Sequence, residues 1–340
     1  MKALTLLSAG DVRVTEIAEP VMQTGDVLLQ VEMAGLCGSD LNSFRGKNPL
    51  VSYPRVLGHE IAATVLEGTH EIPAGTRVTV SPYTSCGNCA ACRRARTEGM
   101  RENACRDNQT LGVQRDGAIA ERIAIPAAKL YPSQTLSLKQ LCIVEPLTVG
   151  FHAVDRGRVR AADTVAVLGC GGIGLGAIAG AAARGARAIA VDLDTEKLRV
   201  AQLAGATDLI DASEGDVVER LRALTDGDGP DVVLEAIGLP STFQLAVEAV
   251  AFTGRVVYIG YAKEPVAYET RLFVQKELDI LGSRNALPRD MHAVMQLLDA
   301  GRFPVDEAVT RVVPLDEAPA IMAAWSANPA AFTKIMIQMR

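Results

Sequence analysis

The chain has 340 residues, of which 49% are apolar and 22% charged, and its formal net charge is -6. This length is sufficient for two domains, each with its own hydrophobic core. The mild acidity disfavours nucleic acid as a partner, because binding a phosphate backbone requires an excess of Lys and Arg. No apolar run reaches the roughly 18 residues that a membrane span needs, so we expect a cytoplasmic protein without a membrane segment.

The first 150 residues predict a β-rich module. The opening "MKALTLLSAGDVRVTEIAEP" is interrupted by charged residues and lacks a small-residue cleavage site, which indicates a first strand rather than a signal peptide. Short strands bounded by turn residues follow in "VLLQVEMAG", "AATVLEGTHEIPAGTRVTVSPY" and "AIAERIAIP".

Near residue 163 the pattern changes to alternating strand and helix. "DTVAVLGCGGIGLGAIAGAAARGA" predicts an apolar strand, a glycine turn and a helix of small residues, and "RAIAVDLDTEKLRVAQLAGA" repeats the strand and helix. Further buried strands are expected in "PDVVLEAIG", "GRVVYIGY" and "LDILGS". Such alternation is typical of a doubly wound parallel sheet, and from about residue 284 mixed helix and short strand return.

Four of the seven cysteines lie in one loop-like stretch, "SCGNCAACRRARTEGMRENAC". Cys86, Cys89 and Cys92 are each two residues apart, and Cys105 follows after twelve more. Structural disulfides are rare in a reducing cytoplasm, so a tetrahedral structural zinc site is the favoured interpretation. The longer loop before Cys105 adds little to the entropic cost of closing the site. The alternative is a cysteine-rich surface loop without a metal.

A dinucleotide-binding pattern follows the strand "TVAVL". Gly169, Gly171 and Gly174 form GxGxxG at the start of a helix, and Asp192 ends the next strand. The glycines would let backbone amides approach a pyrophosphate at the helix N-terminus. Asp192 would bind the adenosine ribose and, with Asp194 close by, would repel a 2′-phosphate, which favours NAD over NADP. The alternative is a glycine turn that serves packing alone.

Three further residues of the β-rich part are candidate metal ligands. Cys37 lies in "AGLCGSD", and His59 and Glu60 are adjacent in "YPRVLGHE". A lone histidine is more often structural, and the spacing alone leaves both interpretations open. Glu145 lies in the apolar run "CIVEPLTVGFHAVDR", where a buried carboxylate needs a cation or hydrogen-bond donors. A structural glutamate with satisfied hydrogen bonds is the alternative there.

Taken together, these motifs resemble the zinc-dependent medium-chain dehydrogenases over essentially the whole chain. "CGSD", "GHE", CxxCxxC, the "EPL.VG.HA" pattern, GxGxxG and "LGSRNA" occur in the order found in that family. "SYPRVLGHEI", "EPLTVGFHAV" and "GSRNALPRDM" are similar to the sorbitol-dehydrogenase branch, and within it to bacterial L-galactonate/L-gulonate 5-dehydrogenases. The resemblance implies an α/β protein with a GroES-like catalytic domain at 1–150 and 285–340, a structural-zinc lobe at about 84–106, and a Rossmann domain at 151–284. It also implies an active site between the two domains.

The resemblance assigns roles to individual residues. It implies that Cys37 and His59 bind the catalytic zinc with Glu60 or Glu145, and that Ser39 relays the alcohol proton. The structural zinc would take Cys86, Cys89, Cys92 and Cys105, although "EGMRE" resembles an insertion before the last cysteine. Asn42 stands where many relatives have a histidine, so proton exit would use water or the ribose. The cofactor-binding residues expected are Gly169, Gly171, Gly172, Ile173, Gly174, Asp192, Lys197, Ile259, Ser283 and Arg284.

The expected activity is a reversible, zinc- and NAD-dependent oxidation of a secondary hydroxyl group, with two zinc ions per chain. We expect a sugar acid such as L-galactonate or L-gulonate, because an arginine can hold a carboxylate through two hydrogen bonds; the candidates are Arg284, Arg55 and Arg115, with Asn285 beside the first. A neutral polyol of the sorbitol type is the alternative. More distant alternatives are a zinc-free quinone or enoyl reductase and a non-catalytic binding protein. A homo-oligomer, dimer or tetramer, is also expected.

Overall fold

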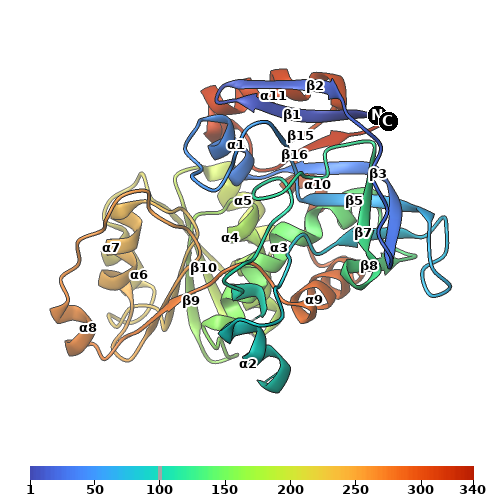
Figure 1. Cartoon of the computed structure of the whole chain (residues 1–340). Helices are drawn as coiled ribbons and strands as arrows, with labels where there is room; N and C mark the ends of the chain where they lie inside the picture. Colours follow the sequence, from blue (N-terminus) through green and yellow to red (C-terminus); the bar gives the residue numbers. More distant parts are fainter. Residues whose placement is uncertain (99–101) are drawn as a thin grey trace. The chain divides into compact units, whose positions relative to one another are not determined.

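The computed structural model describes residues 1–98 and 102–340, and Figure 1 labels many of its elements. The chain divides into two compact units. The first consists of Met1–Glu145, Leu287–Ala300 and Val305–Arg340, and the second of Pro146–Ala286 with Gly301–Pro304. The first unit is therefore discontinuous in sequence, and its C-terminal part is made after the second unit.

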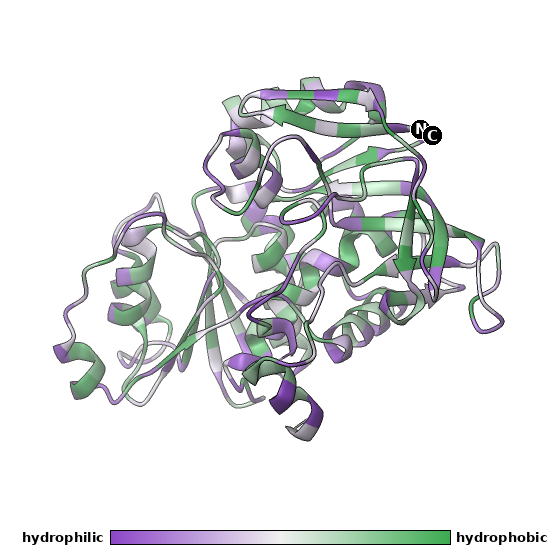
Figure 2. Ribbon diagram, in the orientation of Figure 1, coloured by the Kyte–Doolittle hydropathy of each residue, from purple (hydrophilic) through white to green (hydrophobic). Residues whose placement is uncertain are grey.

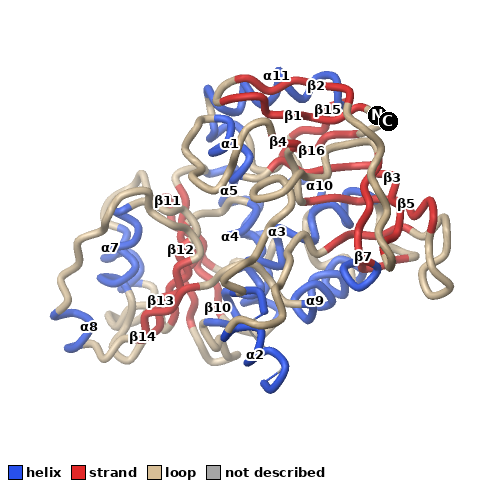
Figure 3. The backbone as a smooth tube through the Cα atoms, in the orientation of Figure 1, coloured by secondary structure: helices blue, strands red, loops and turns tan. Residues whose placement is uncertain are grey.

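The first unit is built on β-sheets, as its sequence predicts. A seven-stranded sheet has the order β15-β16-β3-β5-β6-β8, with β7 also pairing with β3, and a smaller sheet has the order β2-β1-β4. All pairs are antiparallel except β15 with β16. The strands, red in Figure 3, are β1 (Lys2–Ser8), β2 (Asp11–Glu16), β3 (Asp26–Leu36), β4 (Arg55–Val56), β5 (Glu60–Glu67), β6 (Arg77–Val80), β7 (Arg122–Pro126), β8 (Leu130–Ser133), β15 (Arg311–Pro314) and β16 (Ile335–Gln338).

Short helices accompany these sheets. They are α1 (Gly38–Phe44), α2 (Ala90–Glu98), α9 (Pro288–Asp299), α10 (Val305–Ala308) and α11 (Ala318–Ala327), with 3₁₀ turns η1 (Glu102–Ala104), η2 (Ala127–Lys129), η3 (Leu315–Glu317) and η4 (Pro329–Ala331). The cysteine-rich stretch is thus not only a loop, because Cys92 lies within α2. Helix α3 (Leu138–Arg156) carries Glu145, so the end of the predicted β-rich region is helical.

The second unit contains a six-stranded, wholly parallel sheet of order β11-β10-β9-β12-β13-β14. This order reverses next to β9, as in a doubly wound dinucleotide-binding fold. The strands are β9 (Thr164–Leu168), β10 (Arg187–Asp192), β11 (Asp208–Asp211), β12 (Val232–Glu235), β13 (Arg255–Tyr258) and β14 (Asp279–Gly282). The helices are α4 (Gly172–Ala183), α5 (Thr195–Leu203), α6 (Val217–Ala223), α7 (Pro240–Ala249) and α8 (Arg271–Gln275).

Each unit has its own hydrophobic core. The strand "TVAVL" is apolar at almost every position because helices cover both faces of a parallel sheet. In the first unit, apolar side chains of β3 and β5 pack with those of β16 and α11. Figure 2 shows hydrophobic residues concentrated along these strands. Within the described residues, no helix combines the length and the apolar character needed to cross a lipid bilayer.

Candidate functional site: two metal-ligand clusters and a dinucleotide turn

The first cluster forms where β3 ends and β5 begins. These strands pair antiparallel with Gly35 opposite Glu60, so the residues just beyond, Cys37 and His59, lie on the same edge. One ligand atom each of Cys37, His59 and Glu60 lies within 4.8 Å of the others. His59 and Glu60 are buried, and Cys37 is half-buried at the N-cap of α1. A thiol, an imidazole and a carboxylate so arranged are a donor set suited to zinc with an open position.

The electrostatics of this cluster also fit a cation. Burial acts to lower the pKa of His59, but the charge and hydrogen bond of Cys37 raise it well above its ordinary value. Among the described residues, the buried Nδ1 atom of His59 has no hydrogen-bond partner. Buried Asp40 accepts the Cys37 backbone N–H at 2.9 Å, and burial raises the pKa of its carboxyl group. A buried, unpartnered imidazole nitrogen beside a cysteine sulfur is a position that a metal ion can occupy.

Glu60 is held by a buried lysine that the sequence analysis did not identify. Lys334 precedes β16, and its Nζ donates to Oε1 of Glu60 at 2.7 Å and to Oε2 at 2.6 Å. It also donates to the Leu36 carbonyl at 3.1 Å. Burial acts to lower the pKa of Lys334, but the charge of Glu60 raises it above its ordinary value. A Cβ atom at Gly35 would lie 2.1 Å from Oε2 of Glu60, so this close packing requires glycine.

Glu145 lies near the cluster but is not one of the three residues within 4.8 Å of one another. Its side chain, on α3, is buried. Burial raises the pKa of its carboxyl group, although the charge of His59 acts to lower it. The hydroxyl group of Tyr83, a second residue missed by the sequence analysis, donates to Oε1 of Glu145. Burial and the charge of Glu145 raise the pKa of Tyr83 well above its ordinary value, which keeps its hydroxyl protonated.

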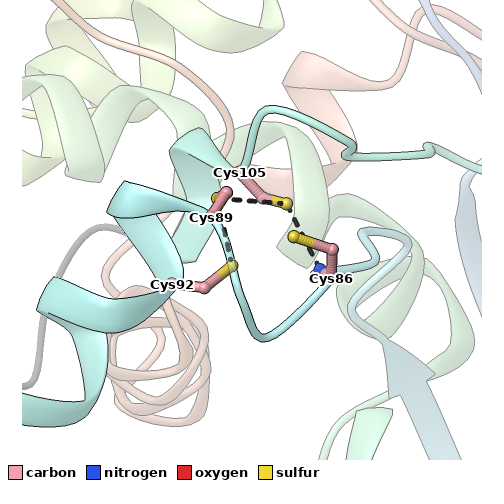
Figure 4. A group of neighbouring side chains, drawn as sticks. All are labelled: Cys86, Cys89, Cys92 and Cys105. Atoms are coloured by element: carbon pink, nitrogen blue, oxygen red, sulfur yellow. Dashed lines mark hydrogen bonds between the residues drawn. The ribbon is translucent and has the colours of Figure 1, made fainter.

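The second cluster consists of the four cysteines, whose sulfur atoms lie within 4.8 Å of one another. Figure 4 shows the sulfurs facing a common centre, and all four are free thiols. Cys89 Sγ lies 3.5 Å from that of Cys92 and 3.9 Å from that of Cys105. Backbone N–H groups of Cys92 and Arg106 lower the pKa of Cys89 to about 6, whereas burial raises that of Cys92 to about 12. The arrangement fits a closed, four-sulfur zinc site.

The long segment before Cys105 does not separate it from the other cysteines. Cys105 is fully buried, and its sulfur accepts the Cys86 backbone N–H at 3.3 Å. Much of the predicted insertion "EGMRE" falls on residues 99–101, which lie outside the described residues.

In the second unit, the glycine turn joins β9 to α4 as predicted. Gly169 has a φ of +93°, and a Cβ at Gly174 would lie 1.8 Å from the Gly169 carbonyl oxygen, so both positions require glycine. Gly171 is the N-cap of α4, and Gly172 and Ile173 form its first turn. The N-terminus of α4 therefore presents backbone N–H groups of the kind that bind phosphate.

Asp192 closes this turn from the end of β10. Its Oδ2 accepts the Cys170 backbone N–H at 2.7 Å, and its Oδ1 accepts that of Asp194 at 3.1 Å. Lys197 lies in the first turn of α5, whose N-cap is Asp194. Ile259 and Ser283 directly follow β13 and β14, at the same carboxyl edge of the sheet where such folds bind ligands. Arg284, next to Ser283, is exposed.

The proposed proton relay and the arginines differ in their surroundings. Within the described residues, the buried Oγ of Ser39, in α1, has no hydrogen-bond partner. Arg55 contacts Asp116 at 3.1 Å and Ser52 at 2.8 Å. Arg115 donates to the Pro82 carbonyl at 3.3 Å, and burial lowers the pKa of its guanidinium group. Arg55 and Arg115 therefore already have protein partners.

Comparison with known proteins matches both parts of the chain. Residues 23–135 match the alcohol dehydrogenase GroES-like domain, and residues 172–300 match the zinc-binding dehydrogenase family. An uncharacterised zinc-type alcohol dehydrogenase-like protein of Haemophilus influenzae is 33% identical over 98% of each chain. L-galactonate-5-dehydrogenase of Escherichia coli is 31% identical over 87% of this chain and 86% of its own. Sorbitol dehydrogenase of Bacillus subtilis is 32% identical over 83% and 81%.

Solved structures agree over the full length. An alcohol dehydrogenase of E. coli CFT073 complexed with NADH has a TM-score of 0.90 and 26% identity, covering 100% of this chain and 99% of that one. A zinc-binding dehydrogenase described as putative, from Sinorhizobium meliloti and bound to NADP, has a TM-score of 0.90 and 32% identity over 99% of both chains.

Proposed function

Because the chain belongs to the zinc-binding alcohol dehydrogenase family and is an NAD-dependent oxidoreductase, we propose that it oxidises a secondary hydroxyl group of a sugar acid to a ketone. L-galactonate and L-gulonate represent the substrate class, and the reaction is reversible. The observation that supports the proposal is the cluster of Cys37, His59 and Glu60, which offers donor atoms suited to a catalytic zinc. The zinc-free reductase and the non-catalytic protein have no use for this set.

We assign two zinc ions to the chain. The catalytic ion would be held by Cys37, His59 and a carboxylate, and the structural ion by Cys86, Cys89, Cys92 and Cys105. For the carboxylate, Glu60 lies within ligand distance but is paired through both oxygens with Lys334. Glu145 is buried near His59, whose charge acts on the pKa of its carboxyl group, and Tyr83 donates to its Oε1. Both glutamates are candidates for the third ligand, and the one that does not bind the ion would contribute negative charge nearby.

The side chains of this site orient the substrate and move its proton. Zinc supplies Lewis acidity, which lowers the pKa of a hydroxyl group and makes its proton easier to remove. Ser39, in the first turn of α1 and two residues after Cys37, would accept that proton at its Oγ and pass its own hydroxyl proton on. Asn42, on the same helix, cannot take up a proton as histidine does, so the proton would continue through water or the cofactor ribose.

The cofactor would bind at the carboxyl edge of the six-stranded sheet. Backbone N–H groups after Gly169 and Gly171 would receive the pyrophosphate, and Asp192 would accept hydrogen bonds from the adenosine ribose. The Asp192 carboxylate would repel a 2′-phosphate, which selects NAD. NAD accepts the hydride that leaves the substrate carbon.

The substrate class rests on Arg284 and on the similarity to L-galactonate-5-dehydrogenase. Arg284 is exposed and follows Ser283 at the carboxyl edge of the parallel sheet, and we take it as the candidate for binding a carboxylate. A neutral polyol is the second candidate substrate. It is favoured by the contacts that already engage Arg55 and Arg115 and by the similarity of the chain to sorbitol dehydrogenase.

The deciding experiment measures kcat/KM with NAD for aldonates and for the matching alditols. We expect the aldonates to be better substrates and Arg284→Gln to reduce kcat/KM for aldonates more than for alditols. A tenfold or greater preference for the alditol would contradict the sugar-acid assignment and leave the dehydrogenase assignment intact.

A further inference from the structure

We propose that Tyr83 is a positioning residue of the catalytic zinc site, and that the four-cysteine cluster acts on that site through it. Tyr83 holds Glu145, and the segments flanking the cysteine cluster hold Tyr83. The inference rests on the proposed function, because it takes Cys37 and His59, with Glu145 as the carboxylate, as the ligands of the catalytic zinc.

The first step is the contact between Tyr83 and Glu145. Both side chains are nearly inaccessible, at 6% and 4% exposure, and the tyrosine hydroxyl donates to Oε1 of Glu145. A buried carboxylate with a fixed donor on one oxygen has its other oxygen aimed in one direction. Hydrogen bonds of this kind orient metal ligands, and their loss typically costs about 10–100-fold in metal affinity.

The second step is the position of Tyr83 in the chain. It lies between the end of β6 and Cys86, in a segment that runs against the residues following Cys105 and forms a bridge with Thr110. The Thr84 N–H donates to the Gln109 carbonyl at 3.1 Å, and the Gln109 N–H donates to Thr84 Oγ1 at 2.8 Å.

The contacts continue on both sides of Thr84. Asn108 Nδ2 donates to the Thr84 carbonyl at 2.8 Å, and the Leu111 N–H donates to the Pro82 carbonyl at 3.2 Å. Pro82 and Thr84, on either side of Tyr83, thus both form backbone hydrogen bonds with residues 109–111, which follow Cys105. The pairing gives the ring little freedom to move without the cysteine segments.

The third step is what a metal ion in the cluster does to this pairing. Cys86 and Cys105 begin and end the cluster, 19 residues apart in sequence, and their direct link is one N–H···S contact of 3.3 Å. An ion bound by all four sulfurs would join the two flanking segments by coordinate bonds, which would fix their register and the position of Tyr83. The cluster is therefore a support for the catalytic site as well as for the fold.

The test compares Tyr83→Phe with Tyr131→Phe. Tyr131 is another buried tyrosine of the first unit, packed edge-on against His292, so its variant controls for the loss of a buried hydroxyl group. Zinc release to a chelator is followed for each protein, and Cys37→Ser identifies which release phase belongs to the catalytic ion. We expect Tyr83→Phe to weaken binding of that ion by about 10–100-fold, with the cysteine-bound ion and thermal unfolding little changed. Unchanged affinity for the catalytic ion in Tyr83→Phe would overturn the proposal.

A double-mutant cycle tests the link to the cysteine cluster. Cys89→Ser should weaken binding of the catalytic ion in the wild-type background and have a smaller effect in the Tyr83→Phe background. If Cys89→Ser folds poorly, Thr84→Val takes its place, because it removes the acceptor for the Gln109 N–H without altering a cysteine. It should likewise weaken binding of the catalytic ion more in the wild-type background than in the Tyr83→Phe background. Equal effects in both backgrounds would overturn the link. Wild-type protein that binds no zinc at Cys37 would instead contradict the proposed function.

Discussion

Lys334 donates to both carboxylate oxygens of Glu60, at 2.7 and 2.6 Å, and the two side chains are exposed by only 6% and 1%. The pair joins the start of β5 to the residue that precedes the last strand. Removing one member of a buried ion pair leaves an uncompensated charge away from water, which is far more costly than losing a surface pair.

The first prediction concerns this pair. Lys334→Met should lower the free energy of unfolding by about 3–5 kcal/mol, measured by urea denaturation. Lys2→Met, which removes an exposed partner of Asp316 at 3.4 Å, is the matched control and should cost less than about 1 kcal/mol. The double variant Lys334→Met with Glu60→Gln should regain part of the loss, because no buried charge is then unpaired. Equal stability of Lys334→Met and Lys2→Met would contradict the prediction.

The second prediction concerns metal content. Freshly purified protein should contain two zinc ions per chain by elemental analysis. Cys37→Ser should retain one ion and the fold but lose turnover, because its sulfur belongs to the catalytic cluster. Cys89→Ser should lose the other ion and mainly lower thermal stability. A wild-type content of one ion would point first to the cysteine cluster, whose last loop is unusually long.

The third prediction concerns the choice of cofactor. Asp192→Ala should raise the KM for NAD and relax discrimination against NADP, by roughly 1–3 kcal/mol for a lost charge-assisted hydrogen bond. Asp192 also accepts backbone N–H groups of Cys170 and Asp194. Asp192→Asn keeps an acceptor there and removes the charge, so it separates repulsion of the 2′-phosphate from loss of the turn. Wild-type protein with a preference for NADP would refute this role.

The fourth prediction concerns pH and stability. Arg187 contacts Asp208 through two hydrogen bonds, at 2.9 and 3.1 Å, and these bonds lower the pKa of the Asp208 carboxyl group. A carboxylate whose pKa is lower in the folded state stabilises the protein above its unfolded pKa of about 3.9. The stabilisation disappears as the pH falls from that value through the folded pKa.

The measurement is urea denaturation of wild type and Asp208→Asn across pH. The variant should be less stable near pH 7, and the difference should be constant down to about pH 5 and shrink below about pH 4. A difference that grew on acidification would show that the stabilisation has another origin.

Features encoded by short-range spacing could be predicted from the sequence. The GxGxxG turn after "TVAVL" and the CxxCxxC run each specify a local geometry. The parallel sheet can be predicted from the alternation of strands and helices. Contacts between segments far apart in the sequence have no such motif, and the two clearest cases are Tyr83 and Lys334. Lys334 carries a charge within the apolar "FTKIMIQM", which signals a buried partner, but nothing local shows that this partner is Glu60. Tyr83 carries no local signal.

The ion pair between Glu60 and Lys334 spans 274 residues of sequence, and this separation has a consequence for biosynthesis. Cys37 and His59 are synthesised early, whereas the lysine that neutralises Glu60 lies in the last segment of the first unit, Val305–Arg340. The second unit is synthesised before the first is complete, and domains generally fold in order of synthesis. The catalytic cluster thus gains the positive charge that neutralises Glu60 only after the whole second unit has been synthesised, so a first unit that folds earlier holds Glu60 without its ion-pair partner.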